Sequence, residues 1–478
     1  MKKLKASKNQ TQVAIFAGAT ALMALTIQSP AQSSDALIDK LVDKGILTTK
    51  EAQELRDESD KGFTTAFQAK TGMPDWVTGY KFSGDFRGRY EQYTSENKTF
   101  VERTRFRYRL RVGVVVSMQG NLETGFQLAS GDPVGSYGGN PNSQNTTMQN
   151  NFSGKSIWVN QAYGKWTPLN SDGWLLSTTI GKMENPFQVT QMVFDQDLTP
   201  EGAAFQAGYT FNDQQALLLT GAAYVLDEEQ LSSQDPALFG GQLMWNANWT
   251  QKISTSLGLA GFAIVQPQQL TSATGTGGAG NVAYVNQGNT RVLFNPPANP
   301  ANSAYVLANK YTPIVADAST TYKLDSFPLY NGVFPIKLAG EYIVNPGVVQ
   351  NNNNNQGVWA GITFGKSGTK GTWDISYRYE YLEADAWYDA LVDDDNVAYY
   401  QNAPVGAPTA NNSGAGVGMY GGTNIKGHLI QANYSITDAL MFSFTCYMNQ
   451  LINQTVQGGV PEPQSKALHV MADVKWKF

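Results

Sequence analysis

The end of the chain alternates between an apolar face and a mostly charged face. The apolar positions are Leu468, Val470, Ala472, Val474, Trp476 and Phe478, and the intervening ones are His469, Met471, Asp473, Lys475 and Lys477. A two-residue period indicates a β-strand, because successive side chains point to opposite sides of the pleat. Such a strand is typical of a transmembrane barrel, which faces lipid outside and water inside, and also of a soluble sandwich. The choice between the two depends on the rest of the chain.

The first residues have the organisation of a secretory signal peptide. An apolar run over 13–27 follows a basic segment and precedes the small residues Ser29 and Ala31, so we expect cleavage after Ala31. Removing residues 1–31 takes away four of the 34 basic residues and none of the 39 acidic ones, which leaves a net charge near −9. An exported acidic protein is a poor candidate for binding nucleic acid.

Residues 32–73 have a helical pattern that differs from the rest of the chain. Leu37 and Leu41 recur at helical spacing, and Thr48 with Glu51 forms a capping box. The apolar stripe is too short to fold alone. We expect a short helical periplasmic segment that self-associates or contacts another envelope component through residues 33–70. A solvated leader with fraying helices is the alternative.

From Trp76 onward the sequence divides into about sixteen alternating segments. No run of 18 or more apolar residues occurs, which argues against membrane-spanning helices. The expected strands are 78–92, 102–117, 121–130, 155–166, 173–183, 203–211, 215–226, 238–250, 252–265, 318–328, 334–344, 357–366, 371–383, 424–435, 439–450 and 466–478.

Long connections alternate with short ones between these strands. The connections over 131–154, 184–202, 266–317 and 384–423 are long and polar, whereas most of those between them are tight turns. Short periplasmic turns and long outer loops are typical of outer-membrane barrels. We therefore predict an all-β chain: a transmembrane antiparallel β-barrel over 74–478 with a polar, hydrated lumen and both ends in the periplasm.

Seven of the ten arginines lie in the first predicted hairpin and share one face of it. We call them the arginine row: Arg87, Arg89, Arg103, Arg105, Arg107, Arg109 and Arg111. They must point into the lumen, because each would cost roughly 2–4 kcal/mol against lipid at mid-bilayer. Asp85, Glu91, Glu123 and an inserted loop are candidates to offset their mutual repulsion. We expect the row to form one wall of a pore constriction or, alternatively, a hydrated wall neutralised by carboxylates.

The connection over 184–202 is the predicted constriction loop. It combines apolar residues with Asp195, Asp197 and Glu201. If it folds into the lumen, these carboxylates approach the arginine row. The resulting transverse field would orient dipolar solutes and filter ions by charge. A loop exposed at the surface is the alternative.

Together these features resemble the general porins of Gram-negative outer membranes. The helical leader followed by the segment Gly84–Tyr90, which reads Gly-Asp-Phe-Arg-Gly-Arg-Tyr, resembles more specifically the putative porin family of large channels. The resemblance implies a homotrimer in outer-membrane lipid and a terminal Phe478 that is read by the barrel-insertion machinery. The leader departs from ordinary porins, which begin directly with a strand.

We expect a passive diffusion channel for small hydrophilic solutes and ions, with the arginine row at its constriction. A channel specific for anions or sugars and a barrel that anchors the envelope remain alternatives. We do not expect an enzyme, because His428 and His469 are the only histidines and neither has Ser-His or His-metal spacing. No catalytic residue, metal or cofactor is predicted. The pattern leaves the solute and the sign of ion selectivity open.

Overall fold

The computed structural model describes residues 74–478 and the single residue Ala52 before them. Within that range it leaves out 99, 134–139, 213, 229–232, 271, 274–286, 295–303, 349–352, 401–417 and 454–463. The predicted signal peptide over 1–31 and the predicted helical segment over 32–73, Ala52 excepted, lie outside the described residues. Among the residues described, no helix is long and apolar enough to cross a membrane.

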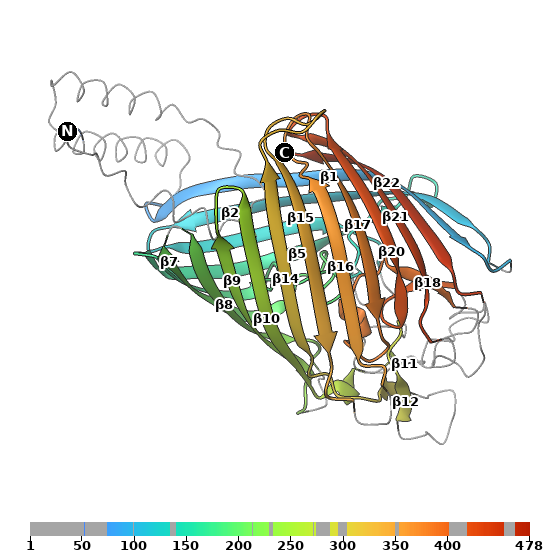
Figure 1. The fold of residues 1–478 in the computed structure, drawn as a ribbon. Coiled ribbons are helices and arrows are strands. Elements are labelled where there is room, and N and C mark those ends of the chain that lie inside the picture. The colour runs from blue at the N-terminus through green and yellow to red at the C-terminus, as the bar shows by residue number, and fades with distance from the viewer. Residues whose placement is uncertain are drawn as a thin grey trace.

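Sixteen long antiparallel strands close into a barrel (Figure 1). They are β1 (Val77–Ser95), β2 (Arg103–Met118), β3 (Leu122–Ser130), β5 (Ile157–Ser171), β6 (Trp174–Lys182), β7 (Glu201–Asn212), β8 (Gln215–Val225), β9 (Ala237–Asn248), β10 (Ile253–Val265), β14 (Ile314–Leu324), β15 (Phe334–Val344), β16 (Gln356–Gly365), β17 (Trp373–Leu382), β20 (Ile425–Ser435), β21 (Leu440–Leu451) and β22 (Ala467–Lys477). The barrel closes where β22 pairs with β1, from Asp85 opposite Lys477 to Ser95 opposite Ala467.

The remaining elements are short and belong to the connections. They are β4 (Thr146–Thr147), which pairs with β2, β11 (Ser272–Ala273), β12 (Arg291–Phe294), β13 (Ala304–Leu307), β18 (Val397–Tyr400), β19 (Gly418–Gly421) and the 3₁₀ turns η1 (Pro267–Gln269) and η3 (Asp389–Leu391). Two small sheets form, one from β11, β12 and β13 and the other from β18 and β19.

Side-chain alternation separates the two faces of the wall, as predicted. On β17 the outward Ile375 and Tyr377 are exposed, whereas the inward Ser376 is buried. On β22 the outward Trp476 is exposed and the inward Asp473 is buried. The outer face is therefore a continuous apolar surface of the kind that hydrocarbon tails cover.

Short turns occupy one end of the barrel and the long connections occupy the other, also as predicted. The turns span 119–121, 172–173, 213–214, 249–252, 325–333, 366–372 and 436–439, and the longest loops span 131–156, 183–200, 266–313 and 383–424. Two strands differ by more than three residues from their expected positions, because the segment expected over 318–328 runs over 314–324 and the one expected over 155–166 runs over 157–171.

The lumen is not a uniform water column, which corrects the expectation of a hydrated interior. Loops 183–200 and 383–424 meet inside the barrel and pack against its wall in one buried apolar cluster. Trp387 is completely buried there, and its indole N–H donates a hydrogen bond of 2.8 Å to the carbonyl of Val193. Phe194 and Phe262 pack edge-on, with ring centroids 5.4 Å apart. These loops fill part of the cross-section with a core like that of a soluble protein.

Candidate functional site

The arginine row lies where the sequence places it, on the inner face of β1 and β2. In the register of this hairpin Arg87 is opposite Arg109 and Arg89 is opposite Arg107. All four side chains are buried, with 6–9% of their surface exposed. Four like charges so close to one another need compensation from acidic groups.

Two acidic residues of β1 supply part of this compensation from within the hairpin. Asp85 accepts hydrogen bonds from Arg109 at 3.0 Å and from Arg111 at 2.6 Å. Glu91 pairs with Arg105 and lies 3.6 Å from Arg107. Both carboxylates were predicted candidates for this role. Glu123, the third candidate, instead accepts a hydrogen bond of 2.9 Å from the Tyr163 hydroxyl.

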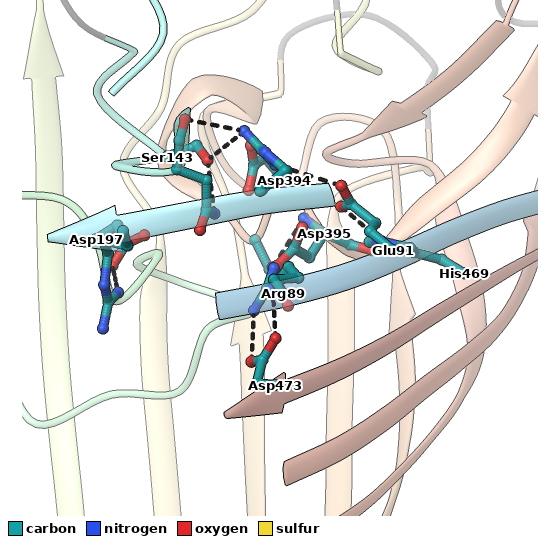
Figure 2. Close-up of polar contacts among 12 residues, drawn as sticks. Arg89, Glu91, Ser143, Asp197, Asp394, Asp395, His469 and Asp473 are labelled. Carbon is teal, nitrogen blue, oxygen red and sulfur yellow. Dashed lines mark hydrogen bonds and ion pairs between the residues drawn. The ribbon is translucent and has the colours of Figure 1, made fainter. Parts of the chain in front are cut away.

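The other partners come from distant parts of the chain (Figure 2). Asp473 of β22 receives two hydrogen bonds from Arg89, at 2.8 and 3.0 Å. Loop 383–424 contributes Asp395, which lies 3.3 Å from Arg89. Loop 183–200 contributes Asp197, which lies 3.0 Å from Arg109. Carboxylates from one strand and two inserted loops therefore converge on the row.

The three acidic residues of the predicted constriction loop have different positions. Asp197 is the one that pairs with an arginine among the described contacts. Asp195 accepts a hydrogen bond of 2.6 Å from the backbone N–H of Asp197, and Glu201 pairs with Lys182 at 2.9 Å at the start of β7. Burial alone would raise the pKa of the Asp197 carboxyl, but the nearby Arg109 and its neighbours in the row lower it below its usual value.

A second group of carboxylates lies where the two inserted loops meet. Oxygens of Asp195, Asp393 and Asp394 lie within 4.8 Å of one another. Burial and the neighbouring carboxylates raise the pKa of Asp195 and Asp394, and burial together with Asp395 raises the pKa of Asp393 to about 6. The Tyr447 hydroxyl donates a hydrogen bond of 2.9 Å to Asp393. This side of the lumen is acidic, in contrast to the arginine row.

Backbone and side-chain hydrogen bonds join three loops to one another. The N–H of Asp195 donates to the carbonyl of Leu391 at 2.8 Å, and that of Asp393 donates to Gln191 at 3.1 Å. The Asn142 side chain of loop 131–156 donates to the carbonyl of Ala390 at 3.0 Å. The inserted loops therefore form one packed unit, which holds its carboxylates in fixed positions.

His469 connects this unit to the closure of the barrel. Its two ring nitrogens lie 3.0 Å from a Glu91 carboxylate oxygen and 2.9 Å from the carbonyl oxygen of Asp395 (Figure 2). Its ring stacks on Tyr93, with centroids 4.1 Å apart. Oxygens of Glu91 and Asp395 and a His469 nitrogen have the proximity of metal ligands, but Glu91 and His469 bind each other in the contacts described.

The matched family agrees with this barrel. A model of the family described as "Putative porin" matches residues 94–398, well over half of the chain. The chain belongs to this family. The porin's strands form a transmembrane antiparallel β-barrel, and its fold indicates a channel. No curated protein sequence matches the porin's own sequence.

Solved porins resemble this porin at low sequence identity. OprB of Pseudomonas putida, in a structure described as its high-pH form, aligns with a TM-score of 0.47 and 11% identity over 88% of this chain and 97% of that one. A mutant of Rhodopseudomonas blastica porin aligns with a TM-score of 0.39 and 11% identity over 84% of this chain and 100% of that one.

Sequence reasoning missed two of the carboxylates that contact the arginine row. Asp473 could have been found, because barrel closure places the last strand beside the first and its parity turns it inward. Asp395 lies far inside a long loop, where no periodicity indicates the direction of a side chain. The terminal Phe478 pairs with β1 through backbone hydrogen bonds of 2.8 and 3.0 Å to Gly84, and its side chain remains exposed.

Proposed function

We propose that this porin is an outer-membrane channel through which small hydrophilic solutes and ions diffuse down their gradients, beside the arginine row. The observation that carries the proposal is the convergence of Asp197 and Asp395, from two inserted loops, on arginines of the barrel wall. Fixed charges of both signs, set inside a closed barrel, are the arrangement that sorts passing ions and dipoles.

The proposed constriction is a gap between a basic side and an acidic side. Its basic side is the arginine row on β1 and β2. Its acidic side is the loop unit that carries Asp195, Asp393 and Asp394, whose oxygens lie within 4.8 Å of one another. A solute in this gap experiences a transverse field, while the apolar cluster around Trp387 keeps the rest of the cross-section closed. The proposal has no catalytic step and no cofactor.

The proposal extends to the location and assembly of the protein. Export after cleavage at Ala31, insertion directed by Phe478 and association into a homotrimer in outer-membrane lipid would place the short turns in the periplasm. Residues 33–70 would then contact the envelope from the periplasmic side. Deleting them tests this role separately, because loss of envelope attachment with retained conductance would assign anchoring to that segment alone.

A selective channel is the second candidate, and one observation favours it over a general one. The inserted loops pack into a buried core with the wall, and four arginines of the row, Arg87, Arg89, Arg107 and Arg109, are more than 90% buried. A route confined to the remaining space admits solutes by their shape and charge. A wide channel would not discriminate in this way.

Planar-bilayer recording of the purified protein tests the channel directly. We expect discrete conductance steps, and we expect Arg105→Gln to move the reversal potential toward cation preference because it removes a positive charge beside the proposed route. Lys252→Gln is the matched control, since Lys252 lies in the turn at the opposite end and pairs with the exposed Asp325 at 2.5 Å. Absence of conductance would refute the channel. An unchanged potential in Arg105→Gln would make the row a structural feature only.

A further inference from the structure

A polar cavity of about 200 Å³ lies beside the arginine row, on the side of the long loops. Three segments line it: the β1–β2 hairpin with Arg105 and Arg107, loop 131–156 with Asp132, Ser143 and Asn145, and loop 383–424 with Asp394 and Asp395. The Asp132 carboxylate accepts hydrogen bonds from the N–H and the hydroxyl of Thr147, so it is already occupied. At roughly 30 Å³ per water, its volume corresponds to about seven waters. A solute the size of a small amino acid fits such a space.

The basic side of the cavity keeps capacity to bind an anion. Arg107 lies 3.6 Å from Glu91, and its other contacts are long hydrogen bonds to the Ser143 hydroxyl and to the carbonyl of Asn145, both at 3.3 Å. Arg105 pairs with Glu91, and its side chain is 17% exposed. Long contacts to neutral groups are weaker than the short charge-assisted bonds that a carboxylate would accept from the same guanidinium.

The acidic side keeps capacity to bind a cation. In the described part of the chain the Asp394 carboxylate forms no hydrogen bond and no ion pair, while its own N–H donates to Asp195 at 3.4 Å. Burial and the adjacent Asp395 and Asp393 raise its pKa well above the usual value. Asp395 pairs with Arg89 and its side chain stays 26% exposed. An ammonium group placed here would relieve the repulsion between these carboxylates.

We propose that this cavity binds a small zwitterion of the α-amino-acid class on its way through the channel. The carboxylate of the solute would contact Arg105 and Arg107, and its ammonium group would contact Asp394 and Asp395. The inference rests on the proposed function and names the class of solute that the route selects. A neutral sugar leaves both charged sides unpaired, and an ion with one charge is attracted by one side and repelled by the other.

Solute-dependent block of the ion current tests the inference. L-alanine, ethylamine and propionate form a matched set, because each analogue keeps one charged group of alanine and lacks the other. We expect L-alanine to reduce the single-channel current saturably. Each analogue should reach the same block of the current only at a concentration at least about tenfold higher, because removal of one charge-assisted hydrogen bond usually lowers the affinity by about that factor.

Asp394→Asn is the matching variant of the protein. It should raise the half-saturating concentration of L-alanine about tenfold. It should lower that of propionate or leave it the same, because it removes the partner of the ammonium group and also a negative charge that repels the propionate carboxylate. Asp325→Asn, which also loses one carboxylate but lies in a turn at the opposite end, should behave like the unaltered protein.

If ethylamine blocks the current as well as L-alanine does, the cavity is a simple cation site and the proposal is overturned. If propionate blocks it as well as L-alanine does, the cavity is an anion site and the proposal is also overturned. An unaltered response of Asp394→Asn would also overturn it. These outcomes leave conductance intact and so differ from failure of the proposed function. If no conductance is seen, equilibrium dialysis of the detergent-solubilised full-length protein with labelled L-alanine tests whether the cavity binds this solute. Saturable binding that Asp394→Asn weakens would support the site, and its absence would overturn it.

Discussion

Asp197 is the residue whose neutralisation should change ion selectivity most cleanly. Six arginines of the row form ion pairs with five carboxylates in the contacts described, so the local balance is already slightly positive. Asp197→Asn removes one of these carboxylates and keeps the shape of the side chain. Arg109 retains its second partner, Asp85, at 3.0 Å, so the loss of charge should not release the arginine from the wall.

The expected size follows from Coulomb's law. One charge acts on an ion roughly 10 Å away with about 0.4 kcal/mol in a water-like dielectric. That energy changes the partition of the ion about twofold. Because the partition of anions rises about twofold and that of cations falls about twofold, the ratio of anion to cation permeability should rise about fourfold.

The reversal potential under a salt gradient measures this ratio. Recording near 10 mM salt keeps the effect visible, because the screening length there is about 30 Å. Glu201→Gln is the control, since Glu201 is close to the same loop, carries the same charge and pairs with Lys182 at 2.9 Å instead of with the row. A shift of equal size in both variants, or none in Asp197→Asn, would refute the assignment of Asp197 to the constriction.

Three more variants test other parts of the molecule. Trp387→Ala should increase single-channel conductance, because the loss of a buried indole costs about 3–5 kcal/mol of loop packing; Trp249→Ala, in the short turn over 249–252, should not change the conductance, because this indole is exposed. Asp473→Asn should lower the temperature at which the barrel unfolds on a gel, because it leaves a buried arginine short of a partner at a cost of about 3–5 kcal/mol, whereas Asp325→Asn should not. The pKa of Asp393 is raised to about 6, so its carboxyl gains a proton as pH falls from 7 to 5. Because the folded state then binds more protons than the unfolded state, the packed loops become more stable over this interval and anion preference rises. Asp393→Asn should abolish that part of the pH dependence of the reversal potential.

The strands of the barrel were predictable from the sequence because their side chains alternate between lipid and an interior. The alternation around Ile375 and Tyr377 reads the same in the sequence and in the structure. The position of Arg89 opposite Arg107 in the strand register follows from the length of one hairpin. Both are local properties, since period and register depend on residues close in the chain.

Loops 383–424 and 266–313, unlike the constriction loop, were not predictable in the same way. Asp389 and Arg291 form a fully buried ion pair at 3.2 Å between loops 383–424 and 266–313, nearly a hundred positions apart in the chain. Trp387 lies in a long loop whose sequence has no period, yet it is completely buried in the barrel. Neither segment has a period that fixes its direction, and only the enclosed space of the barrel decides where it packs.

The bond between Asp473 and Arg89 has a consequence for how the molecule is made. Asp473 follows Arg89 by 384 positions in the chain, so the ribosome synthesises the acidic residue long after the basic one. Until β22 is synthesised, the Arg89 guanidinium lacks the carboxylate to which it donates two hydrogen bonds, and β1 has no strand with which to close the barrel. A chain that ends before β22 would leave Arg89 without this ion pair and the barrel without its closing strand. Synthesis of β22 is therefore a condition both for closing the barrel and for neutralising Arg89.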